Sequence, residues 1–262
     1  MSATTDTLTT LVRDGFILVY NSETLDIVET ARALQKAGID NMEVTCRIKD
    51  AAAKLRRLKK EVPGFKAGAA SLLDYPTTVS RFNRTNPSKA IPTIAGFVEA
   101  GADYLVSAVG FRADTYATYA GKLPLIPGCA TGTEVLAQYE LGASFCKLFP
   151  ASIVGGVKWL DAVEPAIHRI VPIMPTGGTT LENIPDFAAT GTLIFGGSFS
   201  MIAKETLKQI ETAQDYALLA SEFAKIKQAI DAARAKKYPA LNFKTASLAE
   251  IEKVTGRDFN VR

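Results

Sequence analysis

The chain alternates repeatedly between short apolar runs typical of β-strands and stretches with helical periodicity. In the helical stretch 24–36, Leu25, Val28 and Ala31 share one face, and a threonine-rich cap region opens the stretch 133–141. We predict eight strands, at 16–20, 42–47, 66–72, 104–109, 123–126, 145–149, 171–174 and 193–195. Eight such alternations favour an α/β fold of the closed parallel (β/α)8 barrel (TIM barrel) type.

An open doubly wound sheet is the alternative architecture. Its dinucleotide fingerprint of spaced glycines after the first strand is absent, because Tyr20-Asn21-Ser22-Glu23 stands there instead. We therefore expect one domain over residues 1–262, with the barrel at about 15–200 and a C-terminal helical extension at about 201–262. Segment 74–88 is predicted to be an extended loop, with a turn of helix at most, that could cover a site.

Net charge and cysteine content indicate which classes of partner and which cellular compartment to expect. The 30 basic and 27 acidic residues leave a net charge of +3 without a long basic block, so we expect small-molecule partners and neither nucleic acid nor membrane. The three cysteines have no spacing suited to zinc or to a disulfide framework, which favours a reducing, cytoplasmic location. The polar start of the chain lacks the apolar core of a signal peptide.

Lys147 lies in the short apolar run Phe145-Cys146-Lys147-Leu148-Phe149-Pro150. Lysine is rarely buried without a partner, and taking an ammonium out of water favours the neutral amine, which can attack a ketone to form a Schiff base. A lysine whose stem lies on apolar surface while its head reaches water would fit this segment equally well.

The second predicted strand carries Glu43, Thr45 and Arg47 at alternate positions, which places them on one face. These polar residues could also have a purely structural role, either because Glu43 and Arg47 form an internal ion pair or because Arg47 lies beyond the end of the strand. Together with Lys147 at a neighbouring strand exit, these residues would supply an acid/base, a nucleophile and a carboxylate anchor.

Glycine pairs follow the last two predicted strands, at Gly177-Gly178 and Gly196-Gly197, the latter leading into Ser198. Loops at these places commonly bind phosphate in barrels, since glycine lets backbone N–H groups approach an oxyanion. His168 is the single histidine and precedes the seventh strand, away from the expected site. A histidine triad or multi-histidine metal site is thereby excluded, although a carboxylate-held magnesium stays open, and we expect neither cofactor nor metal.

Taken together in order and spacing, these motifs resemble the 2-keto-3-deoxy-6-phosphogluconate (KDPG) and 4-hydroxy-2-oxoglutarate (KHG) aldolases, which are class I lyases on (β/α)8 barrels and usually trimers. The resemblance runs from about residue 16 to 201. It is carried by Glu43-Val44-Thr45-Cys46-Arg47, Gly68-Ala69-Ala70-Ser71, Ile126-Pro127-Gly128, Lys147-Leu148-Phe149-Pro150-Ala151, Gly155-Gly156-Val157-Lys158, Pro175-Thr176-Gly177-Gly178 and Gly196-Gly197-Ser198.

The resemblance implies roles for these positions. Lys147 would form the Schiff base with a pyruvyl ketone, and Glu43 would move protons through water. Arg47 and Ser71 would hold the carboxylate, with Ser71 standing where the family usually has threonine. The remaining substrate contacts implied by the resemblance are Thr45, Pro127, Thr176, Gly177, Gly178, Gly197 and Ser198.

Three departures from the family pattern bear on the substrate. Asn21-Ser22 stands where many phosphate-using relatives place a basic residue, segment 107–111 replaces the usual Ser-Pro-Gly, and both segment 74–88 and the tail are long. The resemblance implies cleavage of a 2-keto-3-deoxy (phospho)sugar acid or of 4-hydroxy-2-oxoglutarate to pyruvate and an aldehyde. The alternatives are a phosphosugar isomerase or epimerase barrel, and a barrel that binds keto acids or phosphosugars without turnover.

Overall fold

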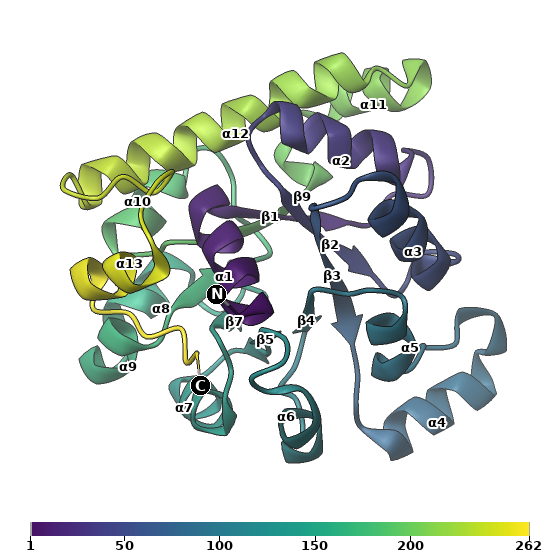
Figure 1. Ribbon diagram of the computed structural model, residues 1–262, viewed down its shortest axis with the longest axis horizontal. Helices are drawn as coiled ribbons and strands as arrows, with labels where there is room; N and C mark the ends of the chain where they lie inside the picture. Colours follow the sequence, from purple (N-terminus) through teal and green to yellow (C-terminus); the bar gives the residue numbers. More distant parts are fainter. Residues whose placement is uncertain (1, 262) are drawn as a thin grey trace.

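In the described part of the chain, nine short strands line the centre of the molecule and helices surround them (Figure 1). The computed structural model describes residues 2–261, so Met1 and Arg262, the ends of the predicted 1–262 unit, lie outside the described part. The strands are β1 Phe16–Tyr20, β2 Asn41–Thr45, β3 Lys66–Leu72, β4 Tyr104–Ser107, β5 Leu125–Ile126, β6 Gly128–Cys129, β7 Cys146–Leu148, β8 Ile173–Pro175 and β9 Phe195–Ser198.

All strand pairings described are parallel. One run of hydrogen-bonded strands has the order β5-β4-β3-β2-β1-β9 and the other the order β6-β7-β8. Pro127, which has no backbone N–H to donate, divides β5 from β6, so these two pieces fill the place of one strand. A parallel bridge between Thr176 and Gly196 links the end of β8 to β9 and closes the ring. The predicted barrel is confirmed, with its eight strand positions in the expected order.

Six of the eight predicted strands have other boundaries in the structure, and two of these differences bear on the site. Strand β2 ends at Thr45, so Arg47 lies in the turn that follows it instead of on the strand face. The last strand runs over Phe195–Ser198 instead of 193–195, so the glycine pair lies within the strand. Apolar content alone marked these runs, whereas the pairing of Gly196 and Gly197 with Ile17 and Leu18 of β1 decides where β9 runs.

Helices follow the strands around the barrel, as the alternation predicted. They are α2 Ile27–Lys36, α3 Ala51–Glu61, α4 Pro76–Thr85, α5 Ile94–Glu99, α6 Ala113–Tyr119, α7 Gly132–Leu141, α8 Val157–Ala162, α9 Pro165–Ile170, α10 Ile184–Ala189 and α11 Lys204–Ala213, with short 3-10 turns at Pro87–Lys89 and Phe199–Met201. Asp26 caps α2 through Val28 N and Glu29 N, and Thr131 and Glu134 form a capping box at α7.

Segment 74–88 is not the extended loop that we predicted. Pro76 takes a first-turn position and α4 follows for ten residues, although none of its side chains is buried. Hydrogen bonds from Arg112 N and the Thr115 hydroxyl to the Asp74 carboxylate, and from the Tyr75 hydroxyl to the Gly110 carbonyl, tie its start to the loop after β4. The loop prediction for this segment is therefore wrong in its secondary structure.

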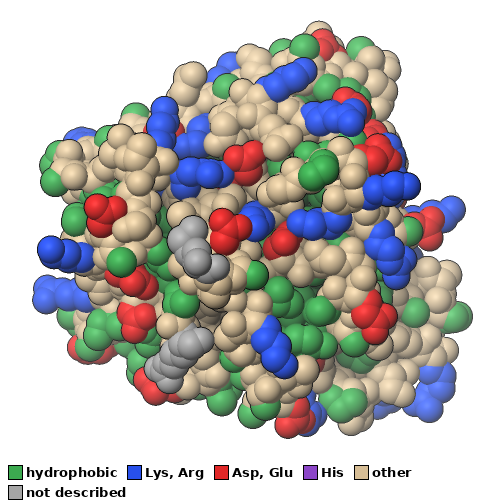
Figure 2. Space-filling view, viewed as in Figure 1, with side chains coloured by type: hydrophobic (Ala, Val, Ile, Leu, Met, Phe, Trp, Pro, Cys, Tyr) green, Lys and Arg blue, Asp and Glu red, His purple; other side chains and the backbone are tan. Residues whose placement is uncertain are grey.

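The two ends of the chain cover the floor of the barrel, where the strands begin. Helix α1 (Ala3–Asp14) and helix α13 (Leu248–Thr255) lie close together there (Figure 1). Leu8, Phe243 and Ile251 are buried in one cluster with barrel-interior residues such as Tyr104 and Phe145. Basic, acidic and apolar side chains are mixed over this side of the molecule (Figure 2). The polar start of the chain did not predict α1, whose threonines include three buried ones.

The helical C-terminal extension is confirmed and centres on α12 (Tyr216–Lys237), which packs along α2 and α10. Arg234, with 0% of its surface exposed, attaches it to the barrel. The Arg234 guanidinium donates to the carbonyls of Val12 and Leu193 and lies 4.2 Å from the Phe243 ring centroid. Within residues 2–261, no helix combines the length and apolarity needed to cross a membrane.

Candidate active site

Lys147 and Glu43 meet inside the barrel. The Lys147 Nζ donates a hydrogen bond of 3.0 Å to Glu43 Oε1, and only 5% of Lys147 and 1% of Glu43 are exposed. The two residues lie 104 positions apart, on strands that are not hydrogen-bonded to each other, so barrel closure brings them together. The alternatives of a solvent-reaching lysine and of a Glu43–Arg47 ion pair are both wrong.

Unused hydrogen-bonding atoms surround this pair. Glu43 Oε2 and Thr176 Oγ1 are buried and have no partner within the described chain. A Cβ atom on Gly196 would lie 2.0 Å from Thr176 Oγ1, so the glycine makes room for the threonine hydroxyl inside the barrel. Buried polar atoms normally find partners, and two unsatisfied oxygens here indicate a place for a polar ligand or water.

Thr45 and Ser71 lie together at the ends of β2 and β3. The Thr45 hydroxyl donates to Ser71 Oγ at 2.9 Å. Ser71 has a left-handed backbone, with φ of 59°, at a register shift between β3 and β4. A β-branched residue is unfavourable in that conformation, which gives a physical reason for serine at this position.

Pro127 and Arg47 occupy different parts of the site. Pro127 is buried beside the lysine strand, and its carbonyl accepts the Lys147 backbone N–H at 2.8 Å. Arg47 is exposed in the turn after β2, and no ion pair or hydrogen bond joins its guanidinium to another described residue. The structure thus brings Glu43, Thr45 and Ser71 to one end of the barrel and leaves Arg47 at its rim.

Of the two glycine pairs predicted to form loops around the distal anion, only the pair after β8 lies in a loop, because the other lies within β9. Gly177 and Gly178 form the turn after β8 with φ of 83° and 92°, which favours glycine. A Cβ on Gly197 would lie 2.1 Å from Met201 Sδ and 2.9 Å from Phe16, so this face of Gly197 is turned to the helix layer. Any contact of Gly197 with a ligand is therefore restricted to its backbone.

Ser198 ends β9, and its hydroxyl lies 2.8 Å from that of Ser200. Ser152, which the sequence did not single out, approaches the same region, since a Cβ on Gly178 would lie 2.5 Å from Ser152 Oγ. Hydroxyl groups thus lie beside the glycine residues at the ends of β8 and β9.

Sequence reasoning also missed two aromatic residues. The Phe149 ring centroid lies 5.3 Å from Lys147 Nζ, just beyond the end of β7 at Leu148. Tyr104 is fully buried and fills the space left by Gly68, whose Cβ would lie 2.1 Å from its ring. Burial and the Glu43 carboxylate raise the pKa of Tyr104 well above its usual value, so its hydroxyl stays protonated.

Cys46 is the cysteine nearest to the predicted anchor Arg47, and it is not a reactive nucleophile. Burial raises the pKa of its thiol to about 11, and the sulfur donates to the Ser71 carbonyl. All three cysteines are free and buried. Residues 2–261 contain no group of three or more His, Cys, Asp or Glu side chains arranged to hold a metal ion.

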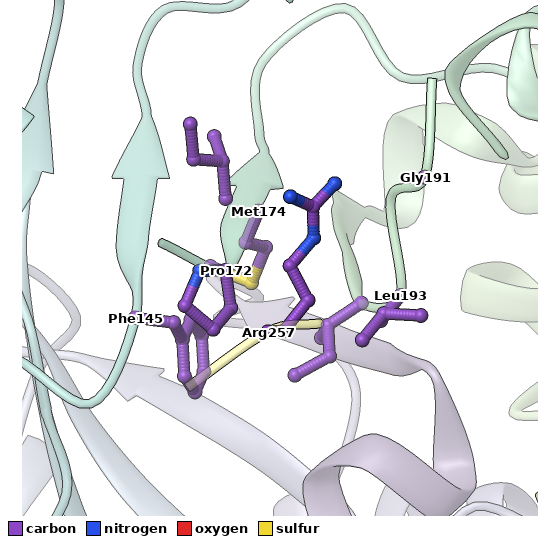
Figure 3. A pocket seen from close by; sticks show the side chains of 8 residues that line it. Phe145, Pro172, Met174, Gly191, Leu193 and Arg257 are labelled. Carbon is purple, nitrogen blue, oxygen red and sulfur yellow. The ribbon is translucent and has the colours of Figure 1, made fainter. Parts of the chain in front are cut away.

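A small cavity at the barrel floor is separate from this site. It has a volume of about 10 Å³ and lies among residues of β8, the approach to β9 and the tail. Arg257 from the tail extends between Met174 and Gly191 (Figure 3). A space of this size holds about one water molecule, so it is no substrate pocket.

The sequence left three possible functions: an aldolase, a phosphosugar isomerase or epimerase, and a non-catalytic binding barrel. Residues 14–217 match the KDPG and KHG aldolase family. The chain belongs to this family. It is therefore an aldolase, a lyase of the class that the sequence resemblance implied, and not an isomerase or a non-catalytic barrel.

Relatives of the KDPG and KHG aldolase family agree in sequence and in structure. The chain is 30% identical over 213 residues to a 2-dehydro-3-deoxy-phosphogluconate aldolase of Pseudomonas aeruginosa, covering 78% of this chain and 86% of that protein. It is 34% identical over 173 residues to a KHG/KDPG aldolase of Escherichia coli K12, with coverages of 66% and 73%. The solved 2-keto-3-deoxy-6-phosphogluconate aldolase of Zymomonas mobilis ZM4 superposes with a TM-score of 0.64 at 26% identity, covering 85% of this chain and 95% of that one.

Proposed function

We propose that this aldolase captures the ketone of a 2-keto acid as a Schiff base on Lys147 and cleaves the neighbouring carbon–carbon bond with Glu43 as proton carrier. The substrate class is a 2-keto-3-deoxy (phospho)sugar acid or 4-hydroxy-2-oxoglutarate, and the products are pyruvate and an aldehyde. The contact of 3.0 Å between Lys147 Nζ and Glu43 Oε1 carries this proposal.

The pair is suited to the proton transfers that imine chemistry requires. Glu43 lies within hydrogen-bond reach of Lys147 and can accept a proton as the amine attacks the ketone. Its second oxygen, Oε2, has no partner in the described chain and can hold the water that leaves when the carbinolamine becomes an imine. Glu43 gives its proton to the carbinolamine hydroxyl as that group leaves as water, and the carboxylate then removes the proton of the substrate hydroxyl on the carbon that becomes the aldehyde. The protonated imine accepts the electron pair of the breaking carbon–carbon bond, which leaves an enamine of pyruvate. Glu43 returns the proton to the enamine carbon, and hydrolysis of the resulting imine releases pyruvate and frees Lys147.

The surrounding residues support a fixed orientation of the substrate. We assign the pyruvyl carboxylate to the Thr45–Ser71 side of the site, with Arg47 at the rim as its cationic partner and Pro127 as a wall. The unpartnered Thr176 hydroxyl is placed to bind a hydroxyl group of the substrate. Gly177, Gly178, Ser198 and the Gly197 backbone would receive the distal carboxylate or phosphate.

Borohydride trapping tests the assignment of Lys147. Pyruvate and borohydride together should add a stable mass to the peptide that contains Lys147 and abolish aldol activity, while borohydride alone should do neither. Lys147→Met is the control that must not be labelled. An adduct on exposed Lys158, or no adduct at all, would show that the Schiff-base lysine is assigned wrongly.

We also propose a cytoplasmic location, a single folding domain and a homotrimer. The three free cysteines support a reducing compartment, and the family resemblance supports the trimer. Light scattering coupled to size exclusion tests the subunit number, and coincidence of unfolding transitions seen by far-UV and tyrosine signals tests the single domain.

A further inference from the structure

A charged groove lies at the opposite end of the barrel from the proposed site. It has a volume of about 570 Å³ and is bordered by the ends of α1 and α2 and by α12. Its charged lining residues are Arg13, Lys36, Asp40, Lys227, Asp231 and Lys244. Clefts of roughly 300–1,000 Å³ are the size that accommodates small metabolites.

Positive charge dominates the groove. Four cations face two carboxylates, which leaves an excess of two positive charges. Both carboxylates are already engaged, because Asp40 pairs with Arg13 at 2.7 Å and Asp231 pairs with Lys227. Lys36 and Lys244 have no ion-pair partner among residues 2–261.

Lys227 makes the groove more than a set of surface lysines. Only 8% of it is exposed, and burial lowers its pKa even though Asp231 acts in the opposite direction. Desolvation thus opposes the charged form of a lysine at the wall of a groove that already has excess cations. An anion in the groove would add favourable Coulomb energy to Lys227, Lys36 and Lys244 together.

One wall of the groove comes from the part of the chain that lies beyond the segment matched by the family. Lys36 and Asp40 lie inside the matched segment 14–217, whereas Lys227, Asp231 and Lys244 lie beyond it. Arg234 attaches this second wall to the barrel through the carbonyls of Val12 and Leu193. The C-terminal extension therefore both builds the groove and holds it in place.

We propose that this groove binds a small metabolite with at least two negative charges, of the phosphorylated sugar-acid class, at a site separate from the active site. The volume exceeds that of an inorganic ion, and two unpaired lysines from separate segments, Lys36 at the end of α2 and Lys244 after α12, suit a ligand with two anionic groups. Gln228 on α12 adds an uncharged hydrogen-bonding group for hydroxyls between them.

Calorimetric titration with 6-phosphogluconate tests this site. This probe has a carboxylate and a phosphate but no ketone, so it cannot form a Schiff base, and Lys147→Met protein can be used in parallel with wild type. Binding at the groove is expected in both proteins, in addition to any binding of the same anionic groups at the active site. Lys36→Glu/Lys244→Glu should weaken binding at the groove at least about tenfold, since each lost charge-assisted contact is replaced by repulsion.

A matched pair of charge reversals provides the control. Lys204→Glu/Lys253→Glu changes two exposed lysines outside the groove and alters the net charge equally, so it should retain the affinity within about twofold. Circular dichroism establishes that each variant is folded, and Lys36→Gln/Lys244→Gln replaces the reversal if that variant is not. Absence of binding to wild type, or equal weakening in the control pair, would overturn the proposal.

Discussion

Replacing Glu43 by glutamine is the sharpest test of the catalytic pair. Glutamine has nearly the same shape, and its amide oxygen can still accept the hydrogen bond of 3.0 Å from Lys147. What it removes is the charge and the ability to carry a proton. General acid/base catalysis contributes about 10² to 10⁴ in rate, which is about 3 to 5 kcal/mol of transition-state stabilisation. We therefore expect turnover to fall by that factor while pyruvate still binds.

The same substitution also breaks a buried ion pair, and the structure sets the size of that effect. At 3.0 Å and an effective dielectric constant of about 20, the Coulomb attraction between the two charges is about 5 kcal/mol. Desolvation of both groups opposes this attraction, so much of it is offset in the folded protein. Lys147→Met/Glu43→Gln removes both charges and should recover stability that Glu43→Gln alone loses.

Two measurements separate these effects. Steady-state turnover and the rate of pyruvate trapping by borohydride report on chemistry, and urea unfolding reports on stability. Glu23→Gln, which changes an exposed carboxylate, is the control and should alter neither rate. Unchanged turnover in folded Glu43→Gln protein would refute the role of Glu43, whereas unfolding without a catalytic defect in the remaining folded fraction would make the pair purely structural.

Four further predictions follow from particular contacts. Gly196→Ala should cost about 1–3 kcal/mol of stability in urea unfolding and slow turnover, because the new Cβ needs the space of Thr176 Oγ1; unaltered values would refute this packing. Burial and the Arg257 charge lower the pKa of His168, so its contribution to stability is complete above about pH 6.5 and is lost as pH falls through the lower folded-state pKa; His168→Gln should flatten this decline in urea midpoints, and an unchanged pH profile would contradict it. Activity should survive exhaustive EDTA treatment, and loss followed by recovery with magnesium or manganese would indicate a metal-dependent aldolase. Ser198→Asp should lower kcat/KM for a phosphorylated substrate more than for 4-hydroxy-2-oxoglutarate in competition assays; an unchanged kcat/KM for the phosphorylated substrate would place the anion elsewhere.

Several parts of the fold and the site could be predicted because they depend on local pattern. Strand positions follow from short apolar runs, and Lys147 is conspicuous because a charge interrupts one of them. The single histidine excludes whole classes of site by inventory alone. Helix α2 likewise follows from the spacing of its apolar residues and its Asp26 cap.

Other parts depend on contacts that only the closed barrel creates. Arg47 follows the two-residue periodicity of β2 in sequence, yet the pairing of β2 with β3 ends at Thr45 and Ala70, just before the left-handed backbone of Ser71. Gly196 and Gly197 have the composition of a loop, but parallel pairing with β1 makes them strand residues facing opposite sides.

The amino-acid sequence by itself determined the alternation of strands and helices, the chemical groups available and the family. The tertiary structure decided which groups meet. Glu43 and Lys147 are 104 residues apart, and no local rule relates them until the barrel closes. The charged groove has the same origin, since Lys36 and Lys244 line one groove only when Arg234 attaches α12 to the barrel floor. Both outcomes rest on long-range packing, which sequence periodicity does not encode.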